Sequence, residues 1–308
     1  MKKLAVLALK GGVGKSTVVA GLSLALVKKR YRVGCVDLDV TGSNLYSALG
    51  LEHSPRWGLD SVNERIIVPK VNGYWLLSIA SFAGEENAVM CDCSHNAELI
   101  GAMKKIGELQ RKVNSEPTVI LDDLETIRKQ IDDVLASSKW RYVMEMLSDN
   151  IVTWPEPLDY QVFDLPPSSS QEMFSFLDRT RDELFGVFIV SQPSAIATTG
   201  LVRTIDLLRV KQIPIIGLVA NQAGFLNRHG ETEYQFLSPR VDLEAVARKA
   251  GIPFLMSLPQ CGDMNKLEPY FTELADKIIR STPVVLKDIT LGKKIKRKIE
   301  AGKKKDRG

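Results

Sequence analysis

Residues that could bind phosphate groups lie together near the N-terminus, in the segment Lys10-Gly11-Gly12-Val13-Gly14-Lys15-Ser16-Thr17. Glycines let the backbone turn tightly, so that successive N–H groups can face phosphate oxygens. Lys15 and Ser16 follow at the spacing at which the ammonium reaches the β- and γ-phosphates and the hydroxyl ligates Mg²⁺. The segment therefore predicts a nucleotide-binding phosphate loop, and the lysine and serine in register argue against a tight turn without a ligand.

A phosphate loop needs a strand before it and a helix after it. Leu4 to Leu9 is a short apolar run, and Thr17 to Lys28 has helical spacing. Further apolar runs fit buried strands, at 33–36, 75–79, 160–163, 187–190, 215–219 and 254–258, with helical stretches at 171–184, 199–210 and 241–250. This alternation predicts an α/β fold, a doubly wound, mostly parallel sheet with helices on both faces, as one P-loop ATPase domain over residues 1–284.

The stretch from about residue 85 to 157 breaks this alternation and is predicted to be a partly helical insertion. Leu121, Leu124, Ile127, Ile131 and Val134 recur at helical spacing, which indicates one or two amphipathic helices. Two interpretations stay open for it, a decorated surface of the same domain and an arm that docks a partner.

The phosphate-loop segment resembles the deviant Walker A motif of the Mrp/MinD/ParA family of P-loop ATPases. The resemblance implies that Lys10 reaches across an ATP-dependent homodimer to the partner's nucleotide. An ammonium there would stabilise the charge that builds in the transition state, as an arginine finger does. Lys10 and Lys15 are thus expected to be catalytic.

Three later segments extend the resemblance. Asp37-Leu38-Asp39 begins a segment like switch I, and Asp159 to Pro167 resembles Walker B with switch II. The likeness implies that Asp39 orients the attacking water and that Asp164 holds Mg²⁺ together with Ser16, whereas Asp37 serves either the metal or the local structure.

The likeness also implies that Asn221 reads the adenine base and that the loop at Pro259 covers the base. A capping role is the alternative for Asn221. The expected ATP-binding set is Gly11, Gly12, Val13, Gly14, Lys15, Ser16, Thr17, Asn221 and Pro259.

The cysteines depart from the Mrp pattern. Mrp-type carriers of iron–sulfur clusters have a Cys-x-x-Cys pair shortly after the adenine-reading asparagine, but residues 222–230 contain no cysteine. Upstream, Cys91-Asp92-Cys93 resembles the Cys-x-Cys element of ATPases that mature carbon monoxide dehydrogenase. Two thiolates from each of two protomers would supply four ligands, so Cys91 and Cys93 are candidate ligands for Zn, Ni or an iron–sulfur cluster at a dimer interface, with His95 as a further candidate. Ordinary buried cysteines are the alternative; Cys35 is expected to pack in a core strand, and Cys261 stays undecided.

The positive charge is concentrated in residues 285–308, the predicted basic tail. Ten lysines and arginines face three acidic residues from Lys287 onward, within a chain of 41 basic and 37 acidic residues, so the body is slightly acidic. Such a tail can attract nucleic acid, whereas its thin apolar face argues against a membrane. A solvated tail without a ligand is the alternative. The absence of an apolar signal-peptide core predicts a cytoplasmic location.

Together these features predict an ATPase switch that dimerises on ATP and handles a metal or iron–sulfur cofactor for an apo-metalloprotein client. The alternative is a ParA/MinD-like positioning or partitioning ATPase that binds DNA or membrane in its ATP state.

Overall fold

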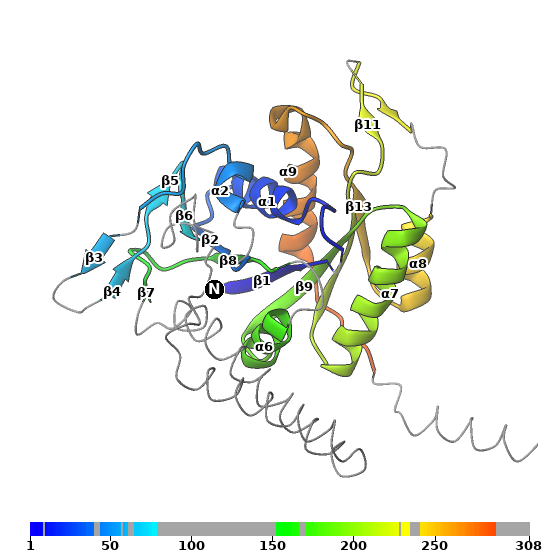
Figure 1. Cartoon of the computed structure of the whole chain (residues 1–308), viewed down its shortest axis with the longest axis horizontal. Coiled ribbons are helices and arrows are strands. Elements are labelled where there is room, and N and C mark those ends of the chain that lie inside the picture. The colour runs from blue at the N-terminus through cyan, green and yellow to red at the C-terminus, as the bar shows by residue number, and fades with distance from the viewer. Residues whose placement is uncertain are drawn as a thin grey trace, which may run out of the picture.

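The computed structural model describes nine stretches of the chain, residues 1–8, 10–39, 44–56, 58–60, 65–78, 152–166, 171–227, 229–234 and 241–287. A central sheet of eight strands runs through them, in the order β13-β10-β9-β1-β8-β2-β6-β5 (Figure 1). Seven of these strands are parallel, and β5 alone pairs antiparallel with β6. Their bounds are β1 Lys2–Leu7, β2 Val33–Asp37, β5 Lys70–Val71, β6 Tyr74–Ser78, β8 Tyr160–Asp164, β9 Leu184–Ser191, β10 Ile215–Ala220 and β13 Phe254–Ser257.

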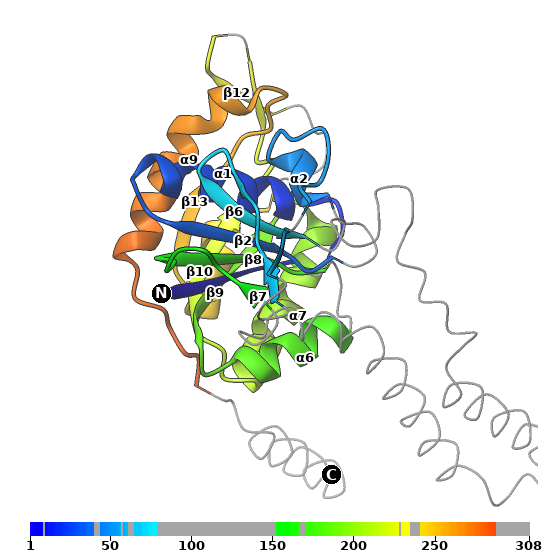
Figure 2. The same cartoon turned by 90° about the vertical axis from the view of Figure 1, so that its left-hand side faces the viewer.

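Helices cover both faces of the sheet, as Figure 2 shows from the side. On one face lie α1 (Lys15–Lys28), the short α2 (Leu45–Ala48) and α9 (Met264–Arg280). On the other lie α6 (Gln171–Thr180), α7 (Ala195–Val210) and α8 (Leu243–Ala250). The strands alternate between two apolar layers, since neighbouring residues such as Leu4 and Ala5 of β1 belong to different buried clusters. The doubly wound, mostly parallel fold predicted from the sequence is confirmed.

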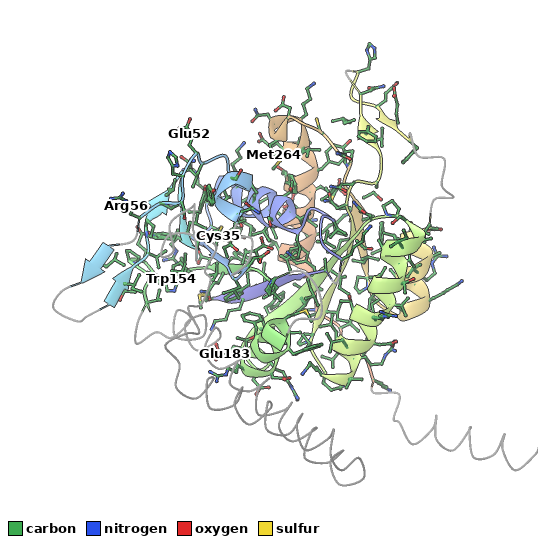
Figure 3. The ribbon with its side chains drawn as sticks, in the orientation of Figure 1. Cys35, Glu52, Arg56, Trp154, Glu183 and Met264 are labelled. Carbon is green, nitrogen blue, oxygen red and sulfur yellow. The ribbon has the colours of Figure 1, made fainter. Side chains whose placement is uncertain are left out.

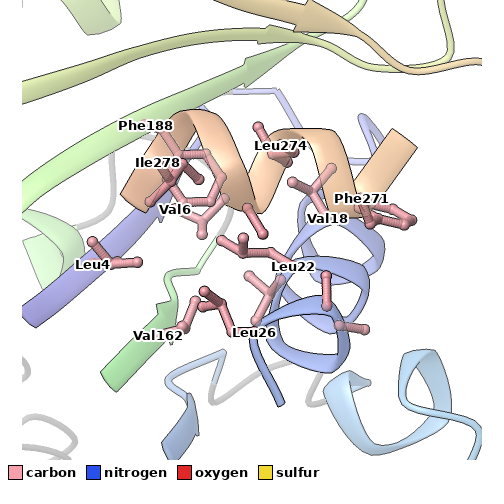
Figure 4. Close-up of a cluster of buried hydrophobic side chains, with 14 of the residues drawn as sticks. Leu4, Val6, Val18, Leu22, Leu26, Val162, Phe188, Phe271, Leu274 and Ile278 are labelled. Carbon is pink, nitrogen blue, oxygen red and sulfur yellow. The ribbon is translucent and has the colours of Figure 1, made fainter. Parts of the chain in front are cut away.

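The layer under α1 and α9 fixes the helix that follows the phosphate loop (Figure 4). Val18, Leu22 and Leu26 of α1 pack with apolar side chains of β1, β8, β9 and α9. Gly21 is required at the contact between the helices, because a Cβ there would lie 2.3 Å from the ring of Phe271. Burial of this apolar stripe therefore holds α1 rigidly against the sheet.

Several elements differ from the sequence-based prediction. The helix expected over 171–184 ends at Thr180, whose hydroxyl donates to the carbonyl of Phe176, and Leu184 instead begins β9. Helix α9 was not predicted, although its apolar residues repeat at helical spacing. A small sheet of β3 (Gly58–Asp60), β4 (Arg65–Ile67) and β7 (Val152–Thr153) and a hairpin of β11 (Phe225–Leu226) and β12 (Thr232–Glu233) were also not predicted, because strands so short carry no periodic signal.

The chain continues to pack against the core beyond α9. Val284 exchanges both backbone hydrogen bonds with Ile215, at 2.8 and 2.9 Å, and Leu286 is buried. The first residues of the predicted tail thus pack on the domain, whereas residues 288–308 lie outside the described part. The predicted insertion also lies outside the described part up to residue 151. The helical stripe from Leu121 to Val134 belongs to this portion.

Within the described residues, no helix combines the length and apolar character needed to cross a bilayer.

Candidate nucleotide site

The phosphate loop lies at the carboxyl end of β1, in the middle of the sheet. Strand β1 ends at Leu7 and α1 begins at Lys15, so the predicted strand, loop and helix are present, although Leu9 lies outside the described residues. Gly12 and Gly14 have φ of 76° and 80°, the left-handed region that favours glycine. The chain order reverses around β1, and ligands of open α/β sheets bind at such a switch point beyond the carboxyl ends of the strands.

Lys15 and Asp164 are brought together in the interior. The Lys15 Nζ lies 3.3 Å from Asp164 Oδ1, and the two side chains are 8% and 1% exposed. Burial raises the pKa of Asp164, and the Lys15 charge and a hydrogen bond from Ser16 only partly oppose this. The buried Asp164 carboxylate is costly to keep charged unless a cation lies beside it. Together with the Ser16 hydroxyl it forms a set of oxygen donors that suits a hard ion such as Mg²⁺.

Asp39 and Asp37 lie on the neighbouring strand end and have different surroundings. The charge of Asp39 adds to the raised pKa of Asp164, so the two carboxylates are close. Asp37 is fully buried and accepts hydrogen bonds from the Asp39 N–H at 3.1 Å and the Leu45 N–H at 3.2 Å. Of the two roles considered for Asp37, these contacts favour the structural one.

Asn221 lies directly against the phosphate loop. Its side-chain amide donates to the carbonyl of Val13 at 2.8 Å, and only 5% of the residue is exposed. A Cβ on Gly14 would lie 2.3 Å from the same amide nitrogen, so the loop and the end of β10 are in close contact. Asn221 therefore braces the phosphate loop, which the sequence did not indicate; a role in reading the base stays a prediction.

The loop at Pro259 is attached to the same region. The Leu258 N–H donates to Ala220 at 2.7 Å, and the Ala223 N–H donates back to Leu258 at 2.9 Å. Pro259 is buried. The predicted base-covering loop and the predicted base-reading residue are thus neighbours in the fold.

Two glutamines beside the loop were missed by sequence reasoning. The side chain of Gln192, after β9, donates to that of Gln222, after β10. Gln222 has φ of 54°, which is rare for a residue with a side chain, and its amide nitrogen lies 3.6 Å from where a Cβ on Gly14 would be. Their positions within three residues of the ends of two predicted strands were the signal that could have found them.

Lys10 is partly buried in the loop that leads to Gly11 and Gly12. Its proposed reach to a partner's nucleotide stays a prediction, as does the contact of Thr17, in the first turn of α1, with the nucleotide.

The cysteines divide into two groups. Cys91, Cys93 and His95 lie outside the described residues. Burial raises the pKa of Cys35 to about 12, which keeps this interior thiol protonated and agrees with the expected packing role (Figure 3). Cys261 is partly buried beside Pro259 and packs on the α1 and α9 layer.

The region 222–230, which lacks the Mrp-type cysteine pair, contains β11 and precedes β12, with which β11 pairs as an antiparallel hairpin. Asn227 closes its tip, where the side-chain oxygen accepts from the N–H groups of His229 and Glu231 at 2.9 Å each and the amide donates to Glu233 at 2.7 Å. Across the described stretches, no three His, Cys, Asp or Glu residues are grouped so as to hold a metal ion. The hairpin tip is therefore held by the hydrogen bonds of the Asn227 side-chain amide.

A family model described as "ParA: NUBPL iron-transfer P-loop NTPase" matches residues 1–108 and 134–300. The chain belongs to this family. The match confirms the predicted membership of the Mrp, MinD and ParA group, and the geometry of Lys15, Ser16 and Asp164 is that of a P-loop NTPase. The residues that the family model matches also include Cys91, Cys93 and part of the basic tail.

Relatives of this NUBPL-type chain are similar over most of its length. The iron–sulfur cluster carrier protein of Aquifex aeolicus is 27% identical over 277 residues, which are 90% of this chain but 60% of that protein. The cytosolic Fe-S cluster assembly factor CFD1 of Kluyveromyces lactis is 26% identical over 279 residues, 88% of this chain and 78% of the relative. The chain thus spans less than two thirds of the Aquifex relative.

Solved structures support the fold. The nucleotide-binding protein of Archaeoglobus fulgidus in complex with ADP has a TM-score of 0.58 at 22% identity, covering 92% of this chain and 93% of that one. The cell division ATPase MinD of Pyrococcus furiosus has a TM-score of 0.53 at 18% identity, covering 91% and 98%. At these identities the likeness concerns the fold alone.

Proposed function

We propose that this NUBPL-type P-loop NTPase binds ATP with Mg²⁺, hydrolyses it as a homodimer, and uses the cycle to load and release an iron–sulfur or related metal cofactor for a client protein. The contact of buried Lys15 with buried Asp164, beside the Ser16 hydroxyl, carries the nucleotide part of this proposal. These three groups suit an anionic phosphate and a hard cation, and Lys15 and Asp164 are costly to bury together without such ligands.

The residues divide the work of hydrolysis. Backbone N–H groups of the phosphate loop and the N-terminus of α1 bind the phosphates, and Lys15 balances the charge of the transferred group. Ser16 and Asp164 would hold Mg²⁺, which when bound neutralises charge on the β- and γ-phosphate oxygens. Asp39 orients the attacking water, while Asn221 and the Pro259 loop hold the adenosine end.

Lys10 would complete the site of the partner subunit. A second ammonium beside the γ-phosphate stabilises transition-state charge, so turnover would require the dimer. We expect Lys10→Ala to lower turnover by roughly 100-fold or more while each protomer still binds ATP. The control is Lys3→Ala, because Lys3 lies at the start of β1, away from the loop that contains Lys10, and pairs with Glu183. Full turnover and normal ATP-dependent dimerisation in Lys10→Ala would reject the trans role.

The cargo proposal is supported by the names of the relatives, an iron–sulfur cluster carrier and an Fe-S cluster assembly factor. In this chain the hairpin after Asn221 lacks thiols, so the cluster would be held elsewhere. Cys91 and Cys93 lie within the residues matched by the family model, and two copies would supply four thiolates.

Metal and acid-labile sulfide analysis of protein purified without oxygen tests this site. We expect about two to four iron per dimer, or about one zinc or nickel, lost in Cys91→Ser/Cys93→Ser. Cys261→Ser is the matched control and should keep the metal. Metal-free wild-type protein that still dimerises with ATP would overturn the cargo proposal.

The basic residues from Lys287 onward favour a second candidate, a positioning ATPase that binds DNA in its ATP state. Because Val284 and Leu286 pack on the core, the truncation that tests it must follow Lys287. ATP-dependent DNA binding lost on truncation would favour this candidate, and binding that persists would exclude the tail as its source.

A further inference from the structure

Two glutamines, Gln212 and Gln222, have left-handed backbone conformations, with φ of 55° and 54°. This conformation costs free energy for a residue with a side chain, and it persists only where the surroundings impose it. The amide of Gln212, just after α7, donates to the carbonyls of Arg209 at 2.6 Å and Leu286 at 2.9 Å. The side chain of Gln212 therefore ties the end of α7 to the chain that follows α9, which is a structural role.

Gln222 is held in the same conformation at the carboxyl edge of the sheet. On one side of it, the Asn221 N–H donates to the carbonyl of Ser191 at 2.9 Å. On the other side, the Ala223 N–H donates to the carbonyl of Leu258 at 2.9 Å. These two hydrogen bonds fix the backbone before and after Gln222, so its side chain has to leave the chain in one direction.

The amide of Gln222 is directed at the phosphate loop. Its Oε1 accepts a hydrogen bond from Nε2 of Gln192, which orients the amide. Its Nε2 lies 3.6 Å from where a Cβ on Gly14 would be, and within the described part of the chain it donates to no protein acceptor. Because this nitrogen carries two N–H donors and the residue is partly buried, the position suits a ligand with oxygen acceptors.

We propose that Gln222 donates a hydrogen bond to an oxygen in the ribose and α-phosphate portion of the bound nucleotide, and that Gln192 is a positioning residue for its amide. This inference rests on the proposed function, since it assumes that ATP occupies the phosphate loop. Gln222 follows Asn221, the predicted base-reading residue, whereas its amide lies at Gly14, the residue before α1. It therefore lies between the base end and the phosphate end of the site. The ribose and α-phosphate connect these ends and are common to ATP and ADP.

Calorimetry with ATP and with ADP, each with Mg²⁺, tests the contact. Gln222→Gly removes the amide but suits the positive φ, so relief of backbone strain offsets the greater freedom of the unfolded chain. We expect affinity for both nucleotides to fall by about tenfold, while the urea midpoint of the nucleotide-free protein stays close to that of wild type. Gln222→Glu keeps the acceptor for Gln192 but puts a charged oxygen in place of the donor. It should bind both nucleotides less tightly than Gln222→Gly.

Gln212→Gly is the matched control, and the opposite pattern is expected from it. This change also removes a glutamine of positive φ, but it breaks the two hydrogen bonds to Arg209 and Leu286. The urea midpoint should therefore fall, while affinity for ATP and ADP stays within about twofold of wild type.

A double-mutant cycle tests the positioning role of Gln192. Gln192→Ala alone should weaken ATP binding by about threefold, but it should cause no further loss in the Gln222→Gly background, because it acts through the Gln222 amide. Equal losses in the two backgrounds would overturn this role. Wild-type affinity in Gln222→Gly, or a loss for ATP alone, would overturn the contact of Gln222 with the nucleotide. A wild-type chain that binds neither ATP nor ADP would instead reject the proposed function.

Discussion

The two ends of β8 each carry an aspartate, and their surroundings are opposite. Asp159, just before the strand, is one-third exposed and accepts from the Arg32 backbone N–H at 2.9 Å and from its guanidinium at 3.0 and 2.8 Å. These hydrogen bonds lower the pKa of Asp159 to about 2. Asp164, at the other end, is buried with one lysine at 3.3 Å, and burial raises its pKa.

The difference separates an edge of the sheet where an aspartate is exposed and paired from an edge where an aspartate is buried. At the amino edge, Asp159 pairs with Arg32 and Lys3 with Glu183 in partly exposed positions, so each pair adds a little to stability. At the carboxyl edge, charge is buried with incomplete pairing, which costs stability in the free protein and is offset when ligands bind. A group that a fold keeps in an unfavourable state is a candidate for function.

The largest effect is expected from Asp164→Asn. This change removes a ligand for the cation, so ATP turnover should fall by roughly 100-fold or more. Because the pKa of Asp164 is raised in the folded state, its ionisation costs stability as pH rises above the ordinary aspartate value, and the neutral amide avoids this cost. The nucleotide-free variant should therefore unfold in urea at a midpoint no lower than that of wild type. A clearly lower midpoint would contradict the comparison.

A smaller effect is expected from Asn221→Ala, which removes the brace between β10 and Val13. The phosphate loop then has more freedom before ATP binds, so affinity for ATP should fall by about tenfold, as read by calorimetry. Asn227→Ala is the control, because Asn227 closes the hairpin tip, where its side chain bonds to His229, Glu231 and Glu233. Equal losses in both variants would show that the brace has no specific role.

The smallest effect is expected from Asp159→Asn at the amino edge. Loss of the paired contact with Arg32 should lower the free energy of unfolding by about 0.5–1 kcal/mol near neutral pH and leave turnover unchanged. Since the folded pKa of Asp159 is depressed, its contribution is complete above the unfolded pKa of about 4 and is lost as pH falls toward about 2. Urea titrations at about pH 7 and about pH 3 should show the two proteins converging at the lower pH. A difference that grows on acidification would be the opposite of this expectation.

Much of the candidate site was predictable because its signals are local. The glycines, Lys15 and Ser16 are contiguous, and Asp39 and Asp164 follow apolar runs. The contact between Asn221 and Val13 was not predictable, because it joins residues 208 apart through the order of the strands. Gln222 was missed for a related reason, since nothing in the sequence gives its positive φ.

The sequence by itself determined the class of fold and the phosphate loop, because apolar periodicity and a glycine-rich turn are properties of neighbouring residues. Only the tertiary structure decided which aspartates are buried and which groups each of them contacts. Asp37 and Asp39 are two residues apart, and Asp159 and Asp164 five, yet the hydrogen bonds and the burial of each carboxylate come from strands and loops distant in the chain. Those surroundings set the free energy that is needed to keep each carboxylate ionised. They therefore distinguish a carboxylate that organises the fold from one that can hold a cation.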